Sequence, residues 1–245
     1  MTAGHPASKP DAVADGSKPV SKRDAIVDAL MALAAERPWS DIELIDVAEA
    51  AGVTLAEFRD LFPSKGAVLG AFSKRIDREV LQGTSDDLKD EPARERVFDV
   101  YMRRLDAMTP YKRALRRIVT ALRQDPVSLM ALNREGLNSQ RFMLAAAGIS
   151  TEGPLGNLKL QGGVIVFANT LQTWLEDDDP ALARTMARLD RELRRGERVL
   201  EQADDLRRLT APLRALGQAL FERGRRPRRP RQRYDDDMSD PAAAI

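Results

Sequence analysis

The sequence contains no cysteine and a single histidine, His5. The lack of cysteine excludes disulfide bonds, thiol catalysis and thiolate ligation of metals. One histidine close to the N-terminus offers little for general acid–base catalysis. A P-loop, a dinucleotide-binding fingerprint and a nucleophile elbow are also missing. We therefore expect a protein that is not an enzyme and that needs no metal or cofactor.

Long hydrophobic runs are lacking too, and none approaches the roughly 18 apolar residues that a transmembrane helix needs. The N-terminal segment has no apolar core of the kind that a signal peptide carries. These absences predict a cytoplasmic protein. Neither charge is in excess, because 39 lysines and arginines face 38 aspartates and glutamates, for a net charge of +1. The net charge therefore neither favours nor opposes a nucleic-acid partner.

The segment spanning residues 42–72 has the pattern of a helix-turn-helix. Its first apolar residues recur at the three- and four-residue spacing of one helix face, namely Leu44, Val47 and Ala48. Gly52 supplies the left-handed backbone that a tight turn between two helices requires. Thr54 and Glu57 have the spacing of a capping box, which predicts the start of a second helix. Such a motif delivers its second helix to the major groove of DNA.

The rest of the chain is patterned as helices and tails. Residues 1–20 combine small, polar and charged residues without periodicity, which predicts a disordered arm. Residues 21–80 are expected to form a three-helix head, and residues 91–222 a helical bundle. Residues 223–245 are predicted to be a disordered tail, whose arginines either bind polyanions or serve only as a solvated terminus. No stretch alternates β-branched residues between turn signals, so we predict an all-α protein.

The segment VAEAAGVTLAEFRDLFPSKGAVLGAF resembles the N-terminal module of the TetR family of transcriptional regulators. The matching positions are Val47, Ala48, Ala51, Gly52, Val53, Thr54, Phe58, Phe62, Ser64, Lys65 and Val68. This resemblance implies a TetR-like fold and a homodimer that binds double-stranded DNA. It also implies a regulator, expected here to be a repressor that a small apolar ligand relieves.

The resemblance further implies that the second helix of the motif and the start of the next one contact DNA. The implied contact positions are Thr54, Leu55, Glu57, Arg59 and Lys65. Arg59 would bind a guanine edge, and Glu57 would accept a hydrogen bond from cytosine. Thr54 and Lys65 would contact phosphates.

The charge of the head opposes this function. From Ser21 to Val80, eight lysines and arginines face eleven aspartates and glutamates, so the head has a net charge of −3. DNA affinity depends heavily on the neutralisation of phosphates, so an acidic head should bind DNA weakly. The alternative is a head that is retained only for folding.

The later segments RLDAMTPYKRALRRI and TLQTWLEDDDPALARTMARLDRELRR resemble a TetR-fold, lipid-binding accessory protein of ubiquinone biosynthesis. That resemblance implies an alternative function, in which the helix-turn-helix is degenerate and the last helix touches a membrane. Leucines recur at positions 206, 209, 213, 216 and 220, with arginines off that stripe. This pattern fits either an interfacial helix over 206–220 or a helix packed on the bundle.

Two further sites are expected in the bundle. Aromatic and thioether side chains suit an adaptable apolar pocket, although such residues more often simply form core: Tyr101, Met102, Met108, Phe142, Met143 and Phe167. The TetR resemblance places the dimer interface on helices 154–176 and 180–201, where the candidate residues are Gly162, Gly163, Ala168, Trp174, Met186 and Leu189. The carboxylates at 176–179 are interpreted as helix caps rather than metal ligands.

Overall fold

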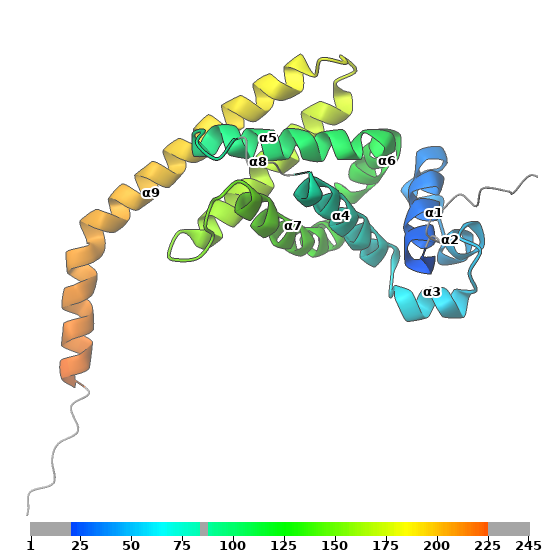
Figure 1. Ribbon diagram of the computed structural model, residues 1–245. Helices are drawn as coiled ribbons and strands as arrows, with labels where there is room; N and C mark the ends of the chain where they lie inside the picture. Colours follow the sequence, from blue (N-terminus) through cyan, green and yellow to red (C-terminus); the bar gives the residue numbers. More distant parts are fainter. Residues whose placement is uncertain (1–20, 84–87, 225–245) are drawn as a thin grey trace, which may run out of the picture. The chain divides into compact units, whose positions relative to one another are not determined.

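The structure, a computed structural model, describes residues 21–83 and 88–224, and it leaves out the side chains at 126–129, at 131 and from 207 onward. The described residues are helical and contain no strand, which confirms the all-α prediction (Figure 1). The chain divides into two compact units, Met1–Leu200 and Glu201–Ile245. The arm predicted over residues 1–20 and the tail from 225 to 245 lie outside the described residues.

The first unit begins with four helices and one 3-10 turn. They are α1 (Lys22–Glu36), η1 (Trp39–Asp41), α2 (Leu44–Ala50), α3 (Leu55–Leu61) and α4 (Lys65–Gln82). Three of the helices begin at a hydroxyl cap, because the side chains of Ser21, Thr54 and Ser64 accept hydrogen bonds from backbone N–H groups in the first turn. Phe58 and Phe62 are both buried in the core to which these helices contribute.

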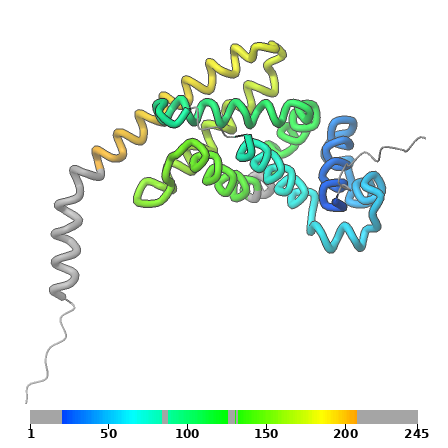
Figure 2. Tube along the Cα trace, viewed as in Figure 1, coloured from blue at the N-terminus to red at the C-terminus, as the bar shows by residue number. Residues whose placement is uncertain are grey.

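The later helices complete the first unit and continue into the second. They are α5 (Ala93–Met108), η3 (Thr109–Tyr111), α6 (Lys112–Leu122), α7 (Pro126–Ala146), α8 (Gly156–Glu176) and α9 (Ala183–Gly224). The segment between the predicted head and bundle, residues 81–90, includes the last residues of α4 and precedes α5 (Figure 2), and both sides of it belong to the first unit. Helix α9 belongs to the second unit from Glu201 onward. Its helical backbone continues through Pro212.

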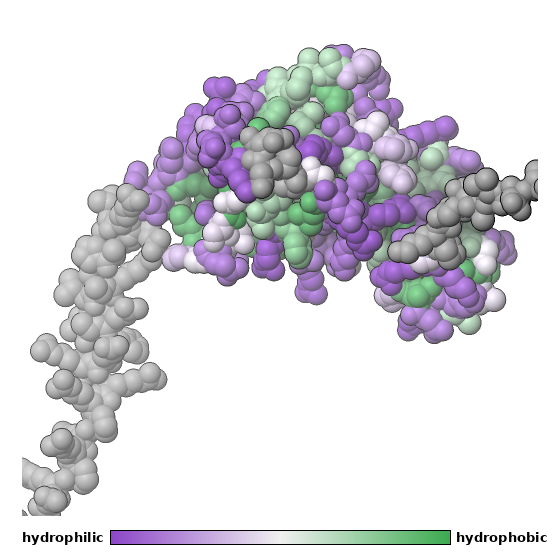
Figure 3. All heavy atoms as spheres, in the orientation of Figure 1, coloured by the Kyte–Doolittle hydropathy of each residue, from purple (hydrophilic) through white to green (hydrophobic). Residues whose placement is uncertain are grey.

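The core of the first unit runs without interruption from the head into the bundle. Helix α1 packs against α6, and α4 packs against both α5 and α7. Phe72 of α4 meets Tyr111 edge to face, with ring centroids 5.0 Å apart. Hydrophilic residues cover most of the coloured surface in Figure 3. Within the described part of the chain, no helix combines the length and the hydropathy needed to cross a bilayer.

Candidate nucleic-acid interface

A tight turn between α2 and α3 sets the direction of the second helix of the motif. Gly52 has φ +66, a left-handed conformation that glycine adopts at little cost. The N–H of Gly52 donates to the Glu49 carbonyl at 3.0 Å, and the N–H of Val53 donates to the Ala48 carbonyl at 3.0 Å. These two bonds close the end of α2, and α3 begins two residues later.

The start of α3 carries the predicted capping box. The Thr54 hydroxyl accepts from the Glu57 N–H at 3.2 Å, and the Glu57 carboxylate accepts from the Thr54 N–H at 2.8 Å. Lys22 on α1 pairs with the same carboxylate at 2.5 Å. The hydrogen bond from Lys22, helped by that from Thr54, lowers the pKa of Glu57 to about 2. Glu57 and Thr54 are thus engaged in holding α3, so a DNA contact by either would compete with the cap.

Lys65, for which the sequence predicted a phosphate contact, is bound to backbone carbonyls of its own chain. Its ammonium group donates to the Trp39 carbonyl at 2.9 Å and to the Ile42 carbonyl at 2.5 Å. The same group lies 4.6 Å from the centre of the Trp39 ring. Burial lowers the pKa of Lys65. Lys65 therefore ties the start of α4 to the segment before α2, and its donors are directed inward rather than toward a phosphate.

The outer face of α3 is where a nucleic acid could be read. Leu55, Arg59 and Asp60 are exposed, whereas Phe58 is buried beneath them. Arg59 forms no ion pair or hydrogen bond with another described residue. Arg23 lies beside this helix, since its guanidinium donates to the Leu61 carbonyl at 3.3 Å. Arg23 therefore borders α3, and Arg59 is the one described cation on the outer face of that helix, next to the exposed Asp60.

The surface of α2 has a different character. Leu44 and Ile45 are 39% and 41% exposed, so Leu44 does not share the buried face of Val47 and Ala48 that its spacing suggested. The carboxylate of Asp46 accepts from the Glu43 N–H at 2.8 Å, which caps the helix. This surface is aliphatic and acidic, and it offers no cation to a phosphate within the described length of α2.

Two charged contacts fix α4, which carries the motif into the bundle. Arg75 pairs with Asp28 of α1 at 2.6 Å and donates to the Tyr111 hydroxyl at 3.2 Å. Two residues further on, Asp77 pairs with Arg104 of α5 at 2.9 Å, and both side chains are almost fully buried. Burial raises the pKa of Asp77 and lowers that of Arg104. These contacts make α4 a stiff connection between α3 and the bundle.

Known protein structures share this arrangement of helices. A TetR transcriptional regulator from Nitrosomonas europaea ATCC 19718 is 24% identical, with a TM-score of 0.57 over 71% of this chain and 97% of that protein. The chain has the fold of TetR-type regulators. A second TetR transcriptional regulator, from Rhodococcus sp. RHA1, is 19% identical, with a TM-score of 0.53 over 71% of this chain and 94% of that protein. No protein-family model matches the chain, and no curated protein matches it.

The bundle of this TetR-type fold uses most of the predicted pocket residues as core. Tyr101 is 1% exposed, its hydroxyl hydrogen-bonds the Gln140 side chain, and its ring lies 5.4 Å from that of Phe167. Met108 and Met143 are buried as well, and Met102 and Phe167 are partly buried against the same core. Phe142 is the exception, since it is 49% exposed on α7. A cavity between α5 and the end of α7 is lined by none of these six residues.

Several predicted dimer residues lie inside the chain instead of on its surface. Trp174 is 1% exposed and Leu189 is fully buried. A Cβ added to Gly163 would come within 2.9 Å of the Gln140 amide oxygen, so this glycine permits close packing within the bundle. The sequence pattern failed here because an apolar stripe marks a face that packs, without saying whether it packs within the chain or against a second one. The exposed apolar residues of α8 and α9 include Leu158, Ile165, Ala168 and Met186, and Gly162 is half-buried.

The acidic junction between α8 and α9 is built from caps. The Asp177 carboxylate accepts from the Thr185 hydroxyl at 2.7 Å and from the Thr185 N–H at 2.9 Å. The bond from the hydroxyl makes the largest contribution to lowering the pKa of Asp177. Lys112 of α6 donates to the Asp177 carbonyl and lies 5.0 Å from the Trp174 ring. Among the described residues, no cluster of histidine, aspartate and glutamate is suited to a metal ion.

Proposed function

We propose that this protein is a homodimeric, DNA-binding transcriptional regulator of TetR type, and specifically a repressor that a small ligand relieves. Residues 21–80 would form the DNA-binding head, and residues 91–222 the ligand-binding and dimerisation bundle. One observation carries the proposal. Arg59 is exposed on the outer face of α3 with no partner among the described residues. The helix itself is held by a capping box at its start and by the buried side chain of Phe58.

Each part of the head would have a separate role on DNA. The guanidinium of Arg59 would donate two hydrogen bonds to a guanine edge in the major groove, which selects sequence. Lys22 and Arg23, at the start of α1 beside α3, would contact phosphates and fix the position of the helix. Leu55, which is 48% exposed, would meet the methyl group of a thymine. The acidic surface of α2 should make this binding weak, because carboxylates repel phosphates.

Pairing of two chains would place two heads on one operator. The outward-facing apolar residues of α8 and α9 supply a surface for this pairing, with Ile165, 57% exposed, near its middle. Two heads on successive major grooves need a defined spacing. A ligand that binds the dimer more tightly at one head spacing would raise the population with that spacing. The free energy of this shift cannot exceed the difference between the ligand's binding free energies for the two states.

The decisive experiment measures binding of the purified protein to genomic DNA fragments, including the region upstream of its own gene, across a salt series. Arg59→Ala is compared with Arg141→Ala, which removes an equally exposed arginine from α7. A variant that ends at Glu222 removes the arginine run, whose charge alone could hold DNA. We expect selective binding that survives the truncation and the Arg141 change and that Arg59→Ala abolishes. Unselective binding that disappears with the tail would reject the proposal.

A second candidate is the lipid-binding accessory role implied by the later segments. The aliphatic and acidic surface of α2 favours it, because a head that no longer meets phosphate can carry such residues. Leu206, the first leucine of the stripe, is 63% exposed, and the side chains from 207 to 220 lie outside the described residues. Flotation with vesicles of phosphatidylglycerol and phosphatidylcholine tests this role. Flotation of the full chain without selective DNA binding would favour it over the regulator.

A further inference from the structure

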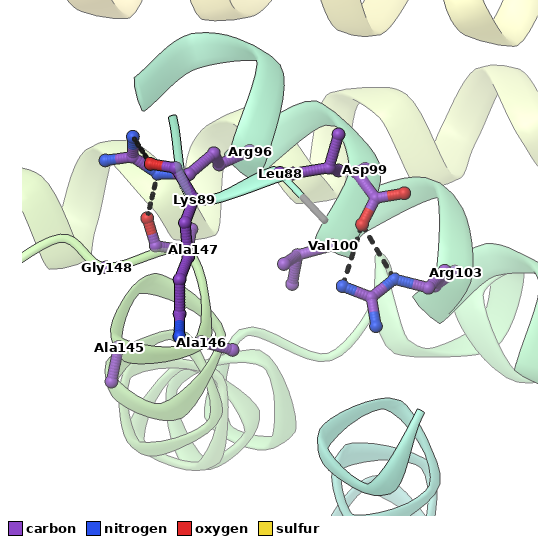
Figure 4. Close-up of a pocket in the computed structure, with 10 residues that line it drawn as sticks. All are labelled: Leu88, Lys89, Arg96, Asp99, Val100, Arg103, Ala145, Ala146, Ala147 and Gly148. Carbon is purple, nitrogen blue, oxygen red and sulfur yellow. Dashed lines mark hydrogen bonds and ion pairs between the residues drawn. The ribbon is translucent and has the colours of Figure 1, made fainter. Parts of the chain in front are cut away.

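A cavity of about 380 Å³ opens between the first turns of α5 and the end of α7 (Figure 4). This volume lies near the lower end of the roughly 300–1,000 Å³ that small-molecule sites occupy. The cavity combines an apolar wall with four charged side chains, Lys89, Arg96, Asp99 and Arg103. It is separate from the six aromatic and thioether residues that the sequence suggested for a pocket.

Arg96 is a fixed cation on the wall of this cavity. Its Nε donates to the Ala147 carbonyl at 2.8 Å, and one terminal nitrogen donates to the carbonyls of Glu91 at 2.5 Å and Lys89 at 3.4 Å. All three acceptors are neutral backbone groups. No carboxylate among the described residues forms an ion pair with Arg96, so its positive charge is held in place without a counter-charge.

The other guanidinium of the cavity is in a different electrostatic state. Arg103 pairs with Asp99 at 2.7 Å and donates to the Gly83 carbonyl at 2.8 Å. Asp99 is the only acidic residue among the described residues that line the cavity, and it is directed toward Arg103, away from Arg96 (Figure 4). The uncompensated positive charge is therefore concentrated at the Arg96 end, where an anion would gain most.

The remaining wall leaves room for an aliphatic group. Leu88, Val100 and the consecutive alanines at 145–147 line the cavity with small or branched apolar side chains. Gly148 follows them with φ +69, a conformation that disfavours any larger residue. A Cβ at Gly148 would lie 3.7 Å from the Arg96 guanidinium, so its absence leaves the face of that cation uncovered.

We propose that this cavity binds an amphipathic anion, with a carboxylate or phosphate head on Arg96 and an aliphatic chain against Val100 and the alanines. If the protein is the ligand-responsive regulator proposed above, such a molecule is its candidate effector. Binding is measured without DNA, so failure of this proposal and failure of the regulator proposal give different results.

The test titrates the full-length protein with decanoate and with decyl phosphate by isothermal calorimetry, using decanol as the uncharged analogue. Arg96→Gln keeps a side-chain N–H donor for the carbonyls and removes the charge. Ala145→Trp fills the cavity from an exposed position and leaves Arg96 untouched. Arg141→Gln makes the same substitution on α7, the helix that carries Ala145, but outside the cavity lining, so it is the matched control for Arg96→Gln.

We expect one or both anions to bind, with the tighter of the two identifying the head group. Arg96→Gln should weaken binding by about tenfold or more, because it removes a charge-assisted hydrogen bond to the anion. Ala145→Trp should weaken binding by about as much, because the indole takes the space of the aliphatic chain. Arg141→Gln should change nothing. Circular dichroism establishes that each variant is folded. No binding by either anion, equal binding of decanol, or full binding by a folded Ala145→Trp variant would overturn the proposal.

Discussion

Replacing Arg104 with methionine should expose how much of this fold depends on one buried charge pair. The Arg104 guanidinium lies 2.9 Å from the Asp77 carboxylate, and the two side chains are 7% and 11% exposed. Arg104 also donates to the Ser139 and Ser73 hydroxyls, and the Ser139 hydroxyl donates to Asp77 at 2.9 Å. The substitution keeps most of the side-chain volume and leaves Asp77 buried without its partner.

The expected cost is about 3–5 kcal/mol of unfolding free energy at pH 7, the usual penalty for one orphaned charge of a buried pair. The double variant Asp77→Asn/Arg104→Met should recover most of this loss. It leaves neither charge of the pair in the core, and the asparagine oxygen can still accept from Ser139. The total free energy of unfolding of a domain is about 5–15 kcal/mol, so the single substitution alone would remove a large share of it.

The pH dependence gives an independent check with a defined sign. Burial raises the pKa of Asp77, and the nearby Arg104 charge opposes that rise. Without Arg104 the folded-state pKa rises further above its unfolded value, so the folded variant binds the proton more tightly than the unfolded one. The resulting stability is fully present below the unfolded pKa of about 3.9 and is lost as pH rises through the folded-state pKa. The deficit of the variant should therefore shrink between pH 7 and pH 4.

Urea unfolding followed by circular dichroism at pH 4, 5.5 and 7 measures these free energies. The reasoning about charge would be refuted if the double variant were as unstable as Arg104→Met at pH 7. It would be refuted equally if the deficit of the single variant stayed constant with pH, because a loss of packing alone does not depend on protonation.

Three other substitutions test the supporting structure, all by the same unfolding assay. Thr54→Ala should cost about 1 kcal/mol through the lost α3 cap, and an unchanged midpoint would mean that the cap contributes nothing. Glu57→Gln should be less stable than the parent at pH 6, with a deficit that narrows as pH falls toward 2. The stability from a lowered carboxyl pKa is complete above the unfolded-state pKa and is lost as pH falls through the folded-state pKa. A deficit that widens as pH falls would contradict this. Trp174→Ala should cost about 3–5 kcal/mol, whereas a loss below about 1 kcal/mol would place this side chain outside the core.

The sequence by itself determined the features whose causes are local. The helix starts at Ser21, Thr54 and Ser64 and the turn at Gly52 depend on hydrogen bonds and backbone conformation within a few residues. The period of apolar residues likewise predicted helices throughout. For the same reason the motif around α2 and α3 is evident in the amino-acid pattern alone, and so is its likeness to TetR-type regulators.

The tertiary structure alone decided which side chains are available. Lys65 carries the same charge whether it meets a phosphate or, as here, the carbonyls before α2, and only packing distinguishes the two. Trp174 and Leu189 are buried within the chain. An apolar stripe marks a helix face that packs, but it does not say whether the face packs within one chain or against a second. The Asp77–Arg104 pair and the cavity at Arg96 join residues 27 and 51 positions apart. No local pattern encodes such contacts, since they form only when the helices that carry them pack together.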